Sequence, residues 1–349
     1  MTLRRQWTPA QARDWYARQP WPVGCNYIPS NAINQLEMWQ ADTFDETTND
    51  RELGRAAGLG FNTIRVYLHD LPWRDDATGF LNRIDRFLTI ALRHRIRCLL
   101  VLFDGVWDPY PEPGSQPAPT PHVHNSRWVQ GPGAEILGDP ARHDETAPYV
   151  TGIISHFRDD ERVLGWDLFN EPDNPNIPYR ARELPDKFEK ALMLLRKAYA
   201  WAREAGPGQP ITSGIWRPQW VMTGELSEMD RFQLEESDII SFHAYAARPI
   251  VEARLAELEA HDRPVFLTEY LARPFGNTFQ SILPLLKEHK IAAYNWGLVS
   301  GKTQTIYPWD SWTKRYDGDP DPWFHDILRP DGSAYDPAEA DFLSHITKA

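Results

Sequence analysis

Apolar runs of strand length alternate with amphipathic segments of helical length along the whole chain. Eight runs are expected to form buried strands: residues 22–27, 63–67, 97–103, 163–169, 211–213, 239–242, 265–268 and 292–296. The longest helical segment covers residues 185–204, with Pro185 at its start and Gly206 just past its end. Because alternating strands and helices are typical of a parallel α/β architecture, the pattern predicts one.

The segments that connect these elements differ in length on the two sides of the predicted strands. Those from strand to helix are long and rich in Pro, Gly and Trp, notably 28–49, 104–140, 173–184 and 297–322, whereas those from helix to strand are short. A (β/α)8 barrel shows this asymmetry when its loops at the carboxyl ends of the strands build a site. The main alternative is a doubly wound sheet, but the Gly-x-Gly-x-x-Gly motif that would support it does not follow the first predicted strand. We therefore expect an α/β (β/α)8 TIM barrel with long βα loops, and residues 1–349 as a single domain.

Two glutamates stand at the ends of predicted strands, 98 residues apart. Glu171 ends the stretch Gly-Trp-Asp-Leu-Phe-Asn-Glu, and Glu269 ends Pro-Val-Phe-Leu-Thr-Glu. A barrel uses about 31 residues per unit, so the spacing corresponds to three units and places the pair on strands four and seven. Two carboxylates facing each other across a barrel mouth suit glycoside hydrolysis, which needs one acid and one nucleophile or base.

Composition narrows the class of partner. A net charge of −12 without a basic run disfavours nucleic acid and anionic membranes, and a neutral substrate fits better. The 15 Trp residues offer flat apolar faces of the kind on which sugar rings stack. No apolar run of about 18 residues predicts a membrane span. No apolar segment follows Arg4 and Arg5, so we expect a cytoplasmic location.

The residues around both glutamates resemble a known clan. Asn170-Glu171-Pro172 and Glu269 are similar to the acid/base and nucleophile motifs of the retaining (β/α)8 glycoside hydrolases that include family 5 cellulases and mannanases. Further positions, spread over roughly residues 23–296, match that pattern: Arg65 in Gly-Phe-Asn-Thr-Ile-Arg, His243 and Tyr245 in His-Ala-Tyr, and Trp296 after Asn295. The resemblance implies a catalytic barrel that needs no cofactor and no metal.

The resemblance also implies individual roles. Glu171 would protonate the leaving oxygen and later activate water, and Glu269 would attack the anomeric carbon. Arg65 and Tyr245 would hold Glu269 ionised, while burial and the anionic neighbour raise the pKa of Glu171. Asn170 would bind the 2-hydroxyl, His243 would contact substrate, and Trp296 would form the floor under the sugar at the −1 subsite.

One position departs from the clan pattern. Strand three commonly ends in a histidine, whereas this chain has Asp104 and, three residues later, Trp107. We expect Asp104 or Trp107 to face the site instead. Residues 307–312, with Trp309 and Trp312, are expected either to pack within their loop or to form a platform for the leaving group.

Other features have simpler explanations that stay open. Glu171 could merely open a loop, and Glu269 could pair with Arg263 or Arg273 on the surface. His122-Val-His124 has metal-ligand spacing but lacks a third ligand, so solvated loop histidines are expected. Cys25 and Cys98 lie on predicted strands one and three, about 9–10 Å apart, and are expected to be free thiols.

The expected function is therefore a retaining glycoside hydrolase that cleaves β-linked gluco-, manno- or xylo-oligosaccharides. An endo-acting β-glycanase on polysaccharide is the first alternative. A non-catalytic sugar-binding barrel is the second, and transglycosylation by the same residues is the third. Sequence-level reasoning predicts an oligosaccharide as the partner in all four cases.

Overall fold

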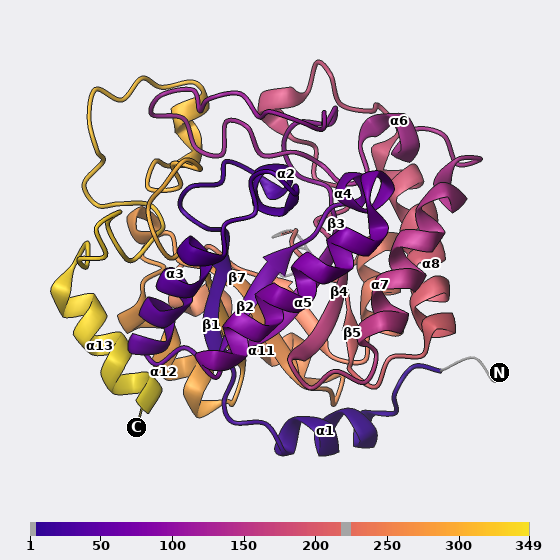
Figure 1. The fold of residues 1–349 in the computed structure, drawn as a ribbon. Coiled ribbons are helices and arrows are strands. Elements are labelled where there is room, and N and C mark those ends of the chain that lie inside the picture. The colour runs from indigo at the N-terminus through magenta and orange to yellow at the C-terminus, as the bar shows by residue number, and fades with distance from the viewer. Residues whose placement is uncertain (1–4, 218–224, 349) are drawn as a thin grey trace.

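The computed structural model describes residues 5–217 and 225–348, in which eight parallel strands surround a common axis (Figure 1). Their order around the sheet is β5-β4-β3-β2-β1-β8-β7-β6. A parallel bridge between Ile215 and Phe242 joins the two ends of this order and closes the ring. The (β/α)8 barrel predicted from the sequence is confirmed. Its strands are β1 (Val23–Tyr27), β2 (Thr63–Tyr67), β3 (Arg97–Asp104), β4 (Val163–Asn170), β5 (Ile211–Thr212), β6 (Ile240–His243), β7 (Val265–Tyr270) and β8 (Ala292–Trp296).

Helices cover the outside of the barrel (Figure 1). Helix α5 illustrates why they form: Asp76 caps its first turn by accepting from Gly79 N, and Phe80, Ile84, Phe87 and Leu88 recur at helical spacing on its buried face. No helix of the described residues is long and apolar enough to cross a bilayer. The main helices are α3 (Glu46–Gly58), α5 (Ala77–Arg93), α7 (Ala147–Phe157), α8 (Lys187–Ala205), α10 (Glu228–Glu236), α11 (Arg248–Glu259), α12 (Phe279–Glu288) and α13 (Pro337–Lys348).

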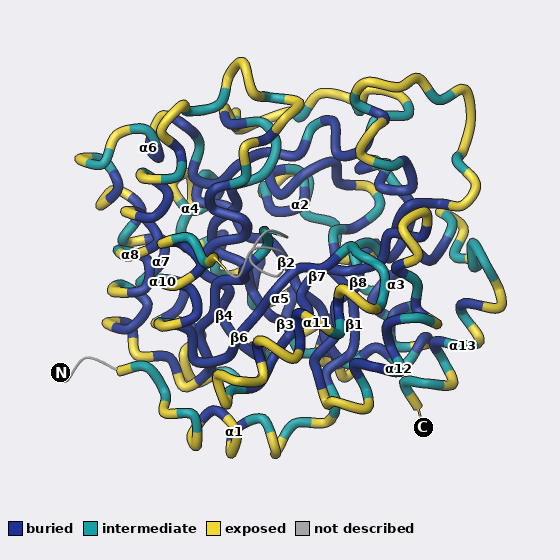
Figure 2. Tube along the Cα trace, turned by 180° about the vertical axis from the view of Figure 1, so that it is seen from behind, coloured by how far each residue is buried: buried dark blue, intermediate teal, exposed yellow. Residues whose placement is uncertain are grey.

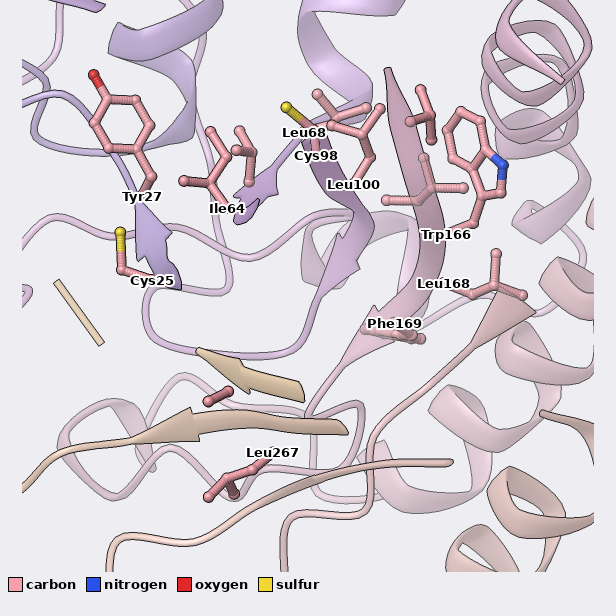
Figure 3. Close-up of a cluster of buried hydrophobic side chains, with 14 of the residues drawn as sticks. Cys25, Tyr27, Ile64, Leu68, Cys98, Leu100, Trp166, Leu168, Phe169 and Leu267 are labelled. Carbon is pink, nitrogen blue, oxygen red and sulfur yellow. The ribbon is translucent and has the colours of Figure 1, made fainter. Parts of the chain in front are cut away.

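Alternate side chains of the strands point outward and pack beneath these helices. Figure 3 shows such a cluster, in which Cys25 and Cys98 stand on separate strands. Both cysteines are buried and free, as predicted. Burial raises the pKa of both thiols, so they stay protonated and act as small apolar groups in the core.

Helix α1 (Pro9–Ala17), which the sequence pattern did not predict, lies across the end of the barrel opposite the long loops (Figure 1). Thr8 and Gln11 form a capping box at its start. Trp15 packs with Leu99, Leu164 and Phe266, which lie on β3, β4 and β7. The helix therefore covers the amino-terminal end of the barrel, and Figure 2 shows its outer side exposed.

The opposite end of the barrel carries the long βα loops, whose described residues include the short helices α2 (Gln35–Trp39), α4 (Asp70–Asp75) and α6 (Ala134–Leu137). Four strands extend one or two residues further into this end than predicted: β3 to Asp104, β4 to Asn170, β6 to His243 and β7 to Tyr270. Backbone pairing continues through them because polar side chains at this end can point into the mouth of the barrel.

Candidate active site

Glu269 lies near the end of β7, buried at the mouth of the barrel. Its Oε1 accepts hydrogen bonds from Arg65 Nη1 and from Tyr67 Oη, each at 2.8 Å. Its Oε2 accepts from Tyr245 Oη at 2.7 Å. Both carboxylate oxygens are therefore held in place by proton donors, which fixes the direction in which the remaining lone pairs point.

Arg65, fully buried on β2, links this carboxylate to the rest of the barrel floor. Its guanidinium donates to Asp167 Oδ2 at 2.8 and 3.0 Å, to Asn26 Oδ1 at 2.9 Å and to Asn170 Oδ1 at 2.7 Å. Burial alone would lower the pKa of Arg65, but Tyr67, Asp167 and Glu269 raise it well above its ordinary value. Arg65 thus remains a cation that orients residues on three other strands.

The surroundings of Glu269 favour its ionised form. Burial acts to raise the pKa of this carboxyl, but the nearby His243 and Arg65 charges and the hydrogen bonds from Tyr245 and Tyr67 outweigh it, and the pKa is lowered. An ionised, desolvated carboxylate at this position is suited to act as a nucleophile.

In an Asp104→Asn background, which removes an ionisation near pH 7 that would mask that of Glu269, Tyr67→Phe is expected to move the acid limb of the kcat/KM profile to higher pH. Loss of the Tyr67 hydrogen bond removes one of the interactions that lower the pKa of Glu269, so the carboxylate takes up a proton at higher pH. A hydrogen bond to a charged group contributes about 1.5–3 kcal/mol, so kcat/KM should also fall roughly tenfold or more. Tyr149→Phe is the matched control, because its buried hydroxyl donates to Leu102 O and to no other described residue, away from the mouth. An unmoved acid limb in Tyr67→Phe would contradict this role.

Glu171 follows β4 directly and adopts φ of 41°, in the left-handed region that non-glycine residues rarely occupy. Such backbone strain clusters at functional sites, where surrounding contacts hold it. Here His243 Nδ1 lies 2.7 Å from Glu171 Oε1, and Asn174 Nδ2 donates to Oε2 at 2.6 Å. The partners of Glu171 are neutral or weakly basic side chains, in contrast to the arginine on Glu269.

The two glutamates are close together. Ligand atoms of Glu171, His243 and Glu269 all lie within 4.8 Å of one another. The nearest carboxylate oxygens are thus well inside the roughly 6.5–9.5 Å separation of inverting glycosidases and near the 5–5.5 Å of retaining ones. The trio could in principle bind a metal, but both oxygens of Glu269 already accept hydrogen bonds from cationic or phenolic donors.

Asp104, at the end of β3, fixes the side chain of Asn170. Its Oδ1 accepts from Asn170 Nδ2 at 3.0 Å and from Val106 N at 3.1 Å, and its Oδ2 accepts from Trp128 Nε1 at 2.6 Å and Gln35 Nε2 at 3.1 Å. With Arg65 on its oxygen and Asp104 on its nitrogen, the Asn170 amide has a single orientation. Burial raises the pKa of Asp104 to about 7, although the Asn170 and Trp128 bonds act to lower it.

Asp104→Asn is expected to reduce both stability and activity. All four neighbours of this carboxylate are donors, so an amide nitrogen there leaves two of them unpaired, at about 1–3 kcal/mol each. The parent enzyme should lose activity as pH falls through about 7, because protonation converts one acceptor oxygen of Asp104 into a donor. The variant has no such ionisation, so its profile should lack the decline near pH 7. Melting temperatures and pH profiles of kcat/KM check both effects; a decline near pH 7 that persists in the variant would contradict the second.

A cavity of about 1160 Å³ opens above the two glutamates. The predicted residues Asp104, Trp107, Asn170, His243, Tyr245 and Trp296 all line it, and Arg65 lies below them. Asp104 and Trp107 both reach the cavity, so the two alternatives for the end of strand three are compatible. The structure brings together every candidate site residue, while their chemical roles stay predictions.

Several residues of the site were not identified from the sequence. Tyr67 was detectable, because it is two residues after Arg65 and therefore on the same face of β2. Asn174, Trp128, Trp216 and His325 lie in irregular segments, where no periodicity indicates which way a side chain points.

The expectation of solvated loop histidines was wrong for His124, which is buried against Trp107 and His325 and lines the cavity. Its Nδ1 donates to Tyr307 O at 2.8 Å, and His122 Nδ1 donates to Tyr316 O at 2.6 Å. Packing within the loop is observed for the segment 307–312, whereas a platform for the leaving group stays a prediction. Tyr307 packs within its loop, whereas Trp309 and Trp312 line the cavity.

Solved structures of glycoside hydrolases resemble this barrel over most of its length. An exo-β-1,4-mannosidase from Opitutaceae bacterium strain TAV5 superposes with a TM-score of 0.62 at 20% identity, covering 94% of this chain and 60% of that one. A GH5_18 protein from Streptomyces cattleya, solved in complex with Manβ1-4GlcNAc, gives a TM-score of 0.60 at 16% identity, with 94% and 80% coverage. The chain has the fold of glycoside hydrolase family 5 barrels.

Other comparisons point in the same direction. An endo-1,4-β-mannanase from Eisenia fetida shares the fold of this chain at a TM-score of 0.60 and 15% identity, over 94% of this chain and 91% of that one. A curated protein from Oryza sativa subsp. japonica, described as a mannan endo-1,4-β-mannosidase, is 27% identical over 139 residues. That match covers 34% of this chain and 26% of the rice protein. No protein-family profile matches the chain. The resemblance predicted from the motifs is confirmed at the level of the fold.

Proposed function

We propose that this protein is a retaining β-glycosidase that hydrolyses β-1,4-linked manno-oligosaccharides. The observation that carries the proposal is the pair Glu171 and Glu269, whose carboxylate oxygens lie within 4.8 Å and of which only Glu269 is hydrogen-bonded to an arginine. Such a pair supports double displacement with net retention. The manno preference among the gluco-, manno- and xylo-oligosaccharides expected from the sequence rests on the solved neighbours, whose titles name mannosidases, mannanases and a Manβ1-4GlcNAc complex.

The proposed reaction has two steps. Glu269 attacks the anomeric carbon while Glu171 gives its proton to the glycosidic oxygen, so that the carbon–oxygen bond breaks and a glycosyl-enzyme ester forms. Glu171, now a carboxylate, then takes a proton from water, which attacks the same carbon and releases Glu269. Asn170 is held where it can bond the 2-hydroxyl, and Trp296 provides the flat face beneath the sugar ring.

Two other functions stay in view. A sugar-binding barrel would use the aromatic cavity without the glutamates, and a transglycosylase would pass the glycosyl group to a sugar hydroxyl instead of water. The strain at Glu171 and the four donors arranged around the two glutamates favour catalysis, because binding alone needs neither.

A panel of aryl β-glycosides and β-1,4-mannobiose tests the proposal. We expect β-mannosides to be hydrolysed faster than β-glucosides or β-xylosides, and proton NMR to show the β-anomer as the first product. Release of the α-anomer first would exclude double displacement. Absence of hydrolysis on every substrate, with sugar binding intact, would favour the sugar-binding alternative, and products longer than the substrate would favour transglycosylation.

A further inference from the structure

Two loops join to form one wall of the cavity. They are residues 120–128, which follow β3, and residues 303–316, which follow β8; together we call them the β3–β8 wall. Asn125 N donates to Thr303 O at 2.8 Å, and His124 N donates to Ser311 Oγ at 3.0 Å. The Gln304 side chain accepts from His122 N at 2.8 Å and donates to Thr120 O at 2.7 Å. These hydrogen bonds join two segments that are about 180 residues apart in the sequence, so the two loops form one continuous wall.

The wall stands directly beside the predicted sugar floor. The Trp128 ring packs against the Trp296 ring, with centroids 5.8 Å apart, and its Nε1 donates to Asp104. His124, Asn125 and Trp128 line the cavity although each is at most 2% exposed. The space between Asn125, Trp128 and Trp296 amounts to about 10 Å³, room for about one water molecule and far too little for a sugar ring. A sugar stacked on Trp296 would therefore contact the wall on the side that faces away from Glu171.

Two histidines give this side of the cavity a polar character. His325 and His124 both line the cavity, with ring centroids 5.4 Å apart. Each donates its Nδ1 proton to a backbone carbonyl, His124 to Tyr307 and His325 to Leu271. Burial lowers the pKa of both rings, that of His124 to about 4, so both are neutral and their Nε2 atoms are acceptors. Paired acceptors suit the hydroxyl groups of a sugar.

Among residues 5–217 and 225–348, the side of the cavity beyond Glu171 is open by contrast. Ile177, which follows β4, and Ile250, in the first turn of α11, line the cavity and are 78% and 46% exposed. Glu171 and its partner Asn174 lie on the same side, at the end of β4. Because the acid delivers its proton to the leaving oxygen, the leaving group must extend toward Glu171 and this open rim.

From this asymmetry we infer that the enzyme is exo-acting: it accepts the non-reducing end of a β-1,4-linked oligosaccharide and releases one sugar at a time. The inference rests on the function proposed above. The β3–β8 wall stops the chain beyond the sugar on Trp296, and His124 and His325 supply acceptors for hydroxyls of that terminal residue. The open rim accommodates leaving groups of different lengths.

Mannohexaose with a fluorescent label at its reducing end tests this directly. We expect the first products to be unlabelled mannose and labelled mannopentaose, followed by successively shorter labelled chains. Labelled fragments of two to four sugars at early times would show internal cleavage and overturn the inference while leaving the proposed hydrolysis intact. Early labelled mannose would overturn it too, because cleavage would then start at the reducing end. If no mannoside is hydrolysed at all, the proposed function itself fails.

Gln304→Ala tests the part played by the wall. The change removes the side chain that joins the two loops, and Gln304 is only half-buried, so the barrel should still fold. We expect internal products from labelled mannohexaose to appear at several times their level in the parent. Gln116→Ala is the matched control, because Gln116 lies in the same β3 loop but makes no bond to the β8 loop among the described residues. An unchanged pattern in Gln304→Ala, or an equal change in the control, would contradict this role.

Discussion

Glu269→Gln is expected to lower kcat/KM on β-mannosides by a factor on the order of 10⁴ or more, because it removes the nucleophile of the first step. Gln has the shape of Glu but cannot form the glycosyl ester. Its amide nitrogen would also face Arg65 and Tyr67 or Tyr245, all of which donate to Glu269 now. Steady-state rates, together with calorimetric binding of β-1,4-mannobiose, separate loss of chemistry from loss of substrate affinity.

The control for this variant is Glu259→Gln, an exposed glutamate on α11 that pairs with His289. It should leave kcat/KM unchanged. Folding of Glu269→Gln is checked by its melting temperature, since a carboxylate bonded to a buried arginine contributes to stability as well. A folded Glu269→Gln protein that hydrolyses mannosides at the rate of the parent would remove Glu269 from the mechanism.

Glu171→Ala should give a different pattern, in which the loss depends on the leaving group. Without the general acid, cleavage of mannobiose should fall by about 10²–10⁴-fold. Glycosides with an acidic phenol leaving group need no protonation, so their first step should stay fast and the glycosyl-enzyme should accumulate. A burst of phenol followed by slow turnover, measured by stopped-flow absorbance, is the expected signature.

Added azide sharpens the same experiment. The small anion can enter the space left by the Glu171 side chain and attack the glycosyl-enzyme without a general base. Turnover of the aryl glycoside should therefore recover with azide in Glu171→Ala and not in Glu269→Gln. Equal losses on mannobiose and on the activated glycoside, without a burst, would contradict the acid/base role of Glu171.

Much of the barrel is predictable from the sequence because its strands are buried on both faces. Runs such as Leu99-Leu-Val-Leu-Phe103 have few alternatives to a central parallel strand, and the 98-residue spacing of the glutamates fits their observed positions, directly after β4 and on β7. Strand ends were less predictable. His243 and Glu269 have the polarity of loop residues, and only the barrel mouth explains why they continue strands.

The residues of the candidate site likewise fall into those that the sequence could identify and those that it could not. Residues on strands or directly after them, such as Arg65 and Asn170, could be identified because strand alternation and short motifs fix where they point. His124 and His325 could not, since their positions depend on contacts between loops that are remote in sequence. The pairing of Asp104 with Asn170 was also hidden, because it joins two strands through side chains alone.

Arg65 has a consequence for how such barrels can be altered. Its guanidinium connects β2 to β1, β4 and β7 below the cavity, through Asn26, Asp167 and Glu269, and none of these partners belongs to a long loop. The Glu269 carboxylate is thereby anchored independently of the loops that surround the cavity. If Glu269 is the nucleophile proposed above, exchanging the loops between barrels of this type should change sugar preference while the residues bonded to Arg65 stay the same.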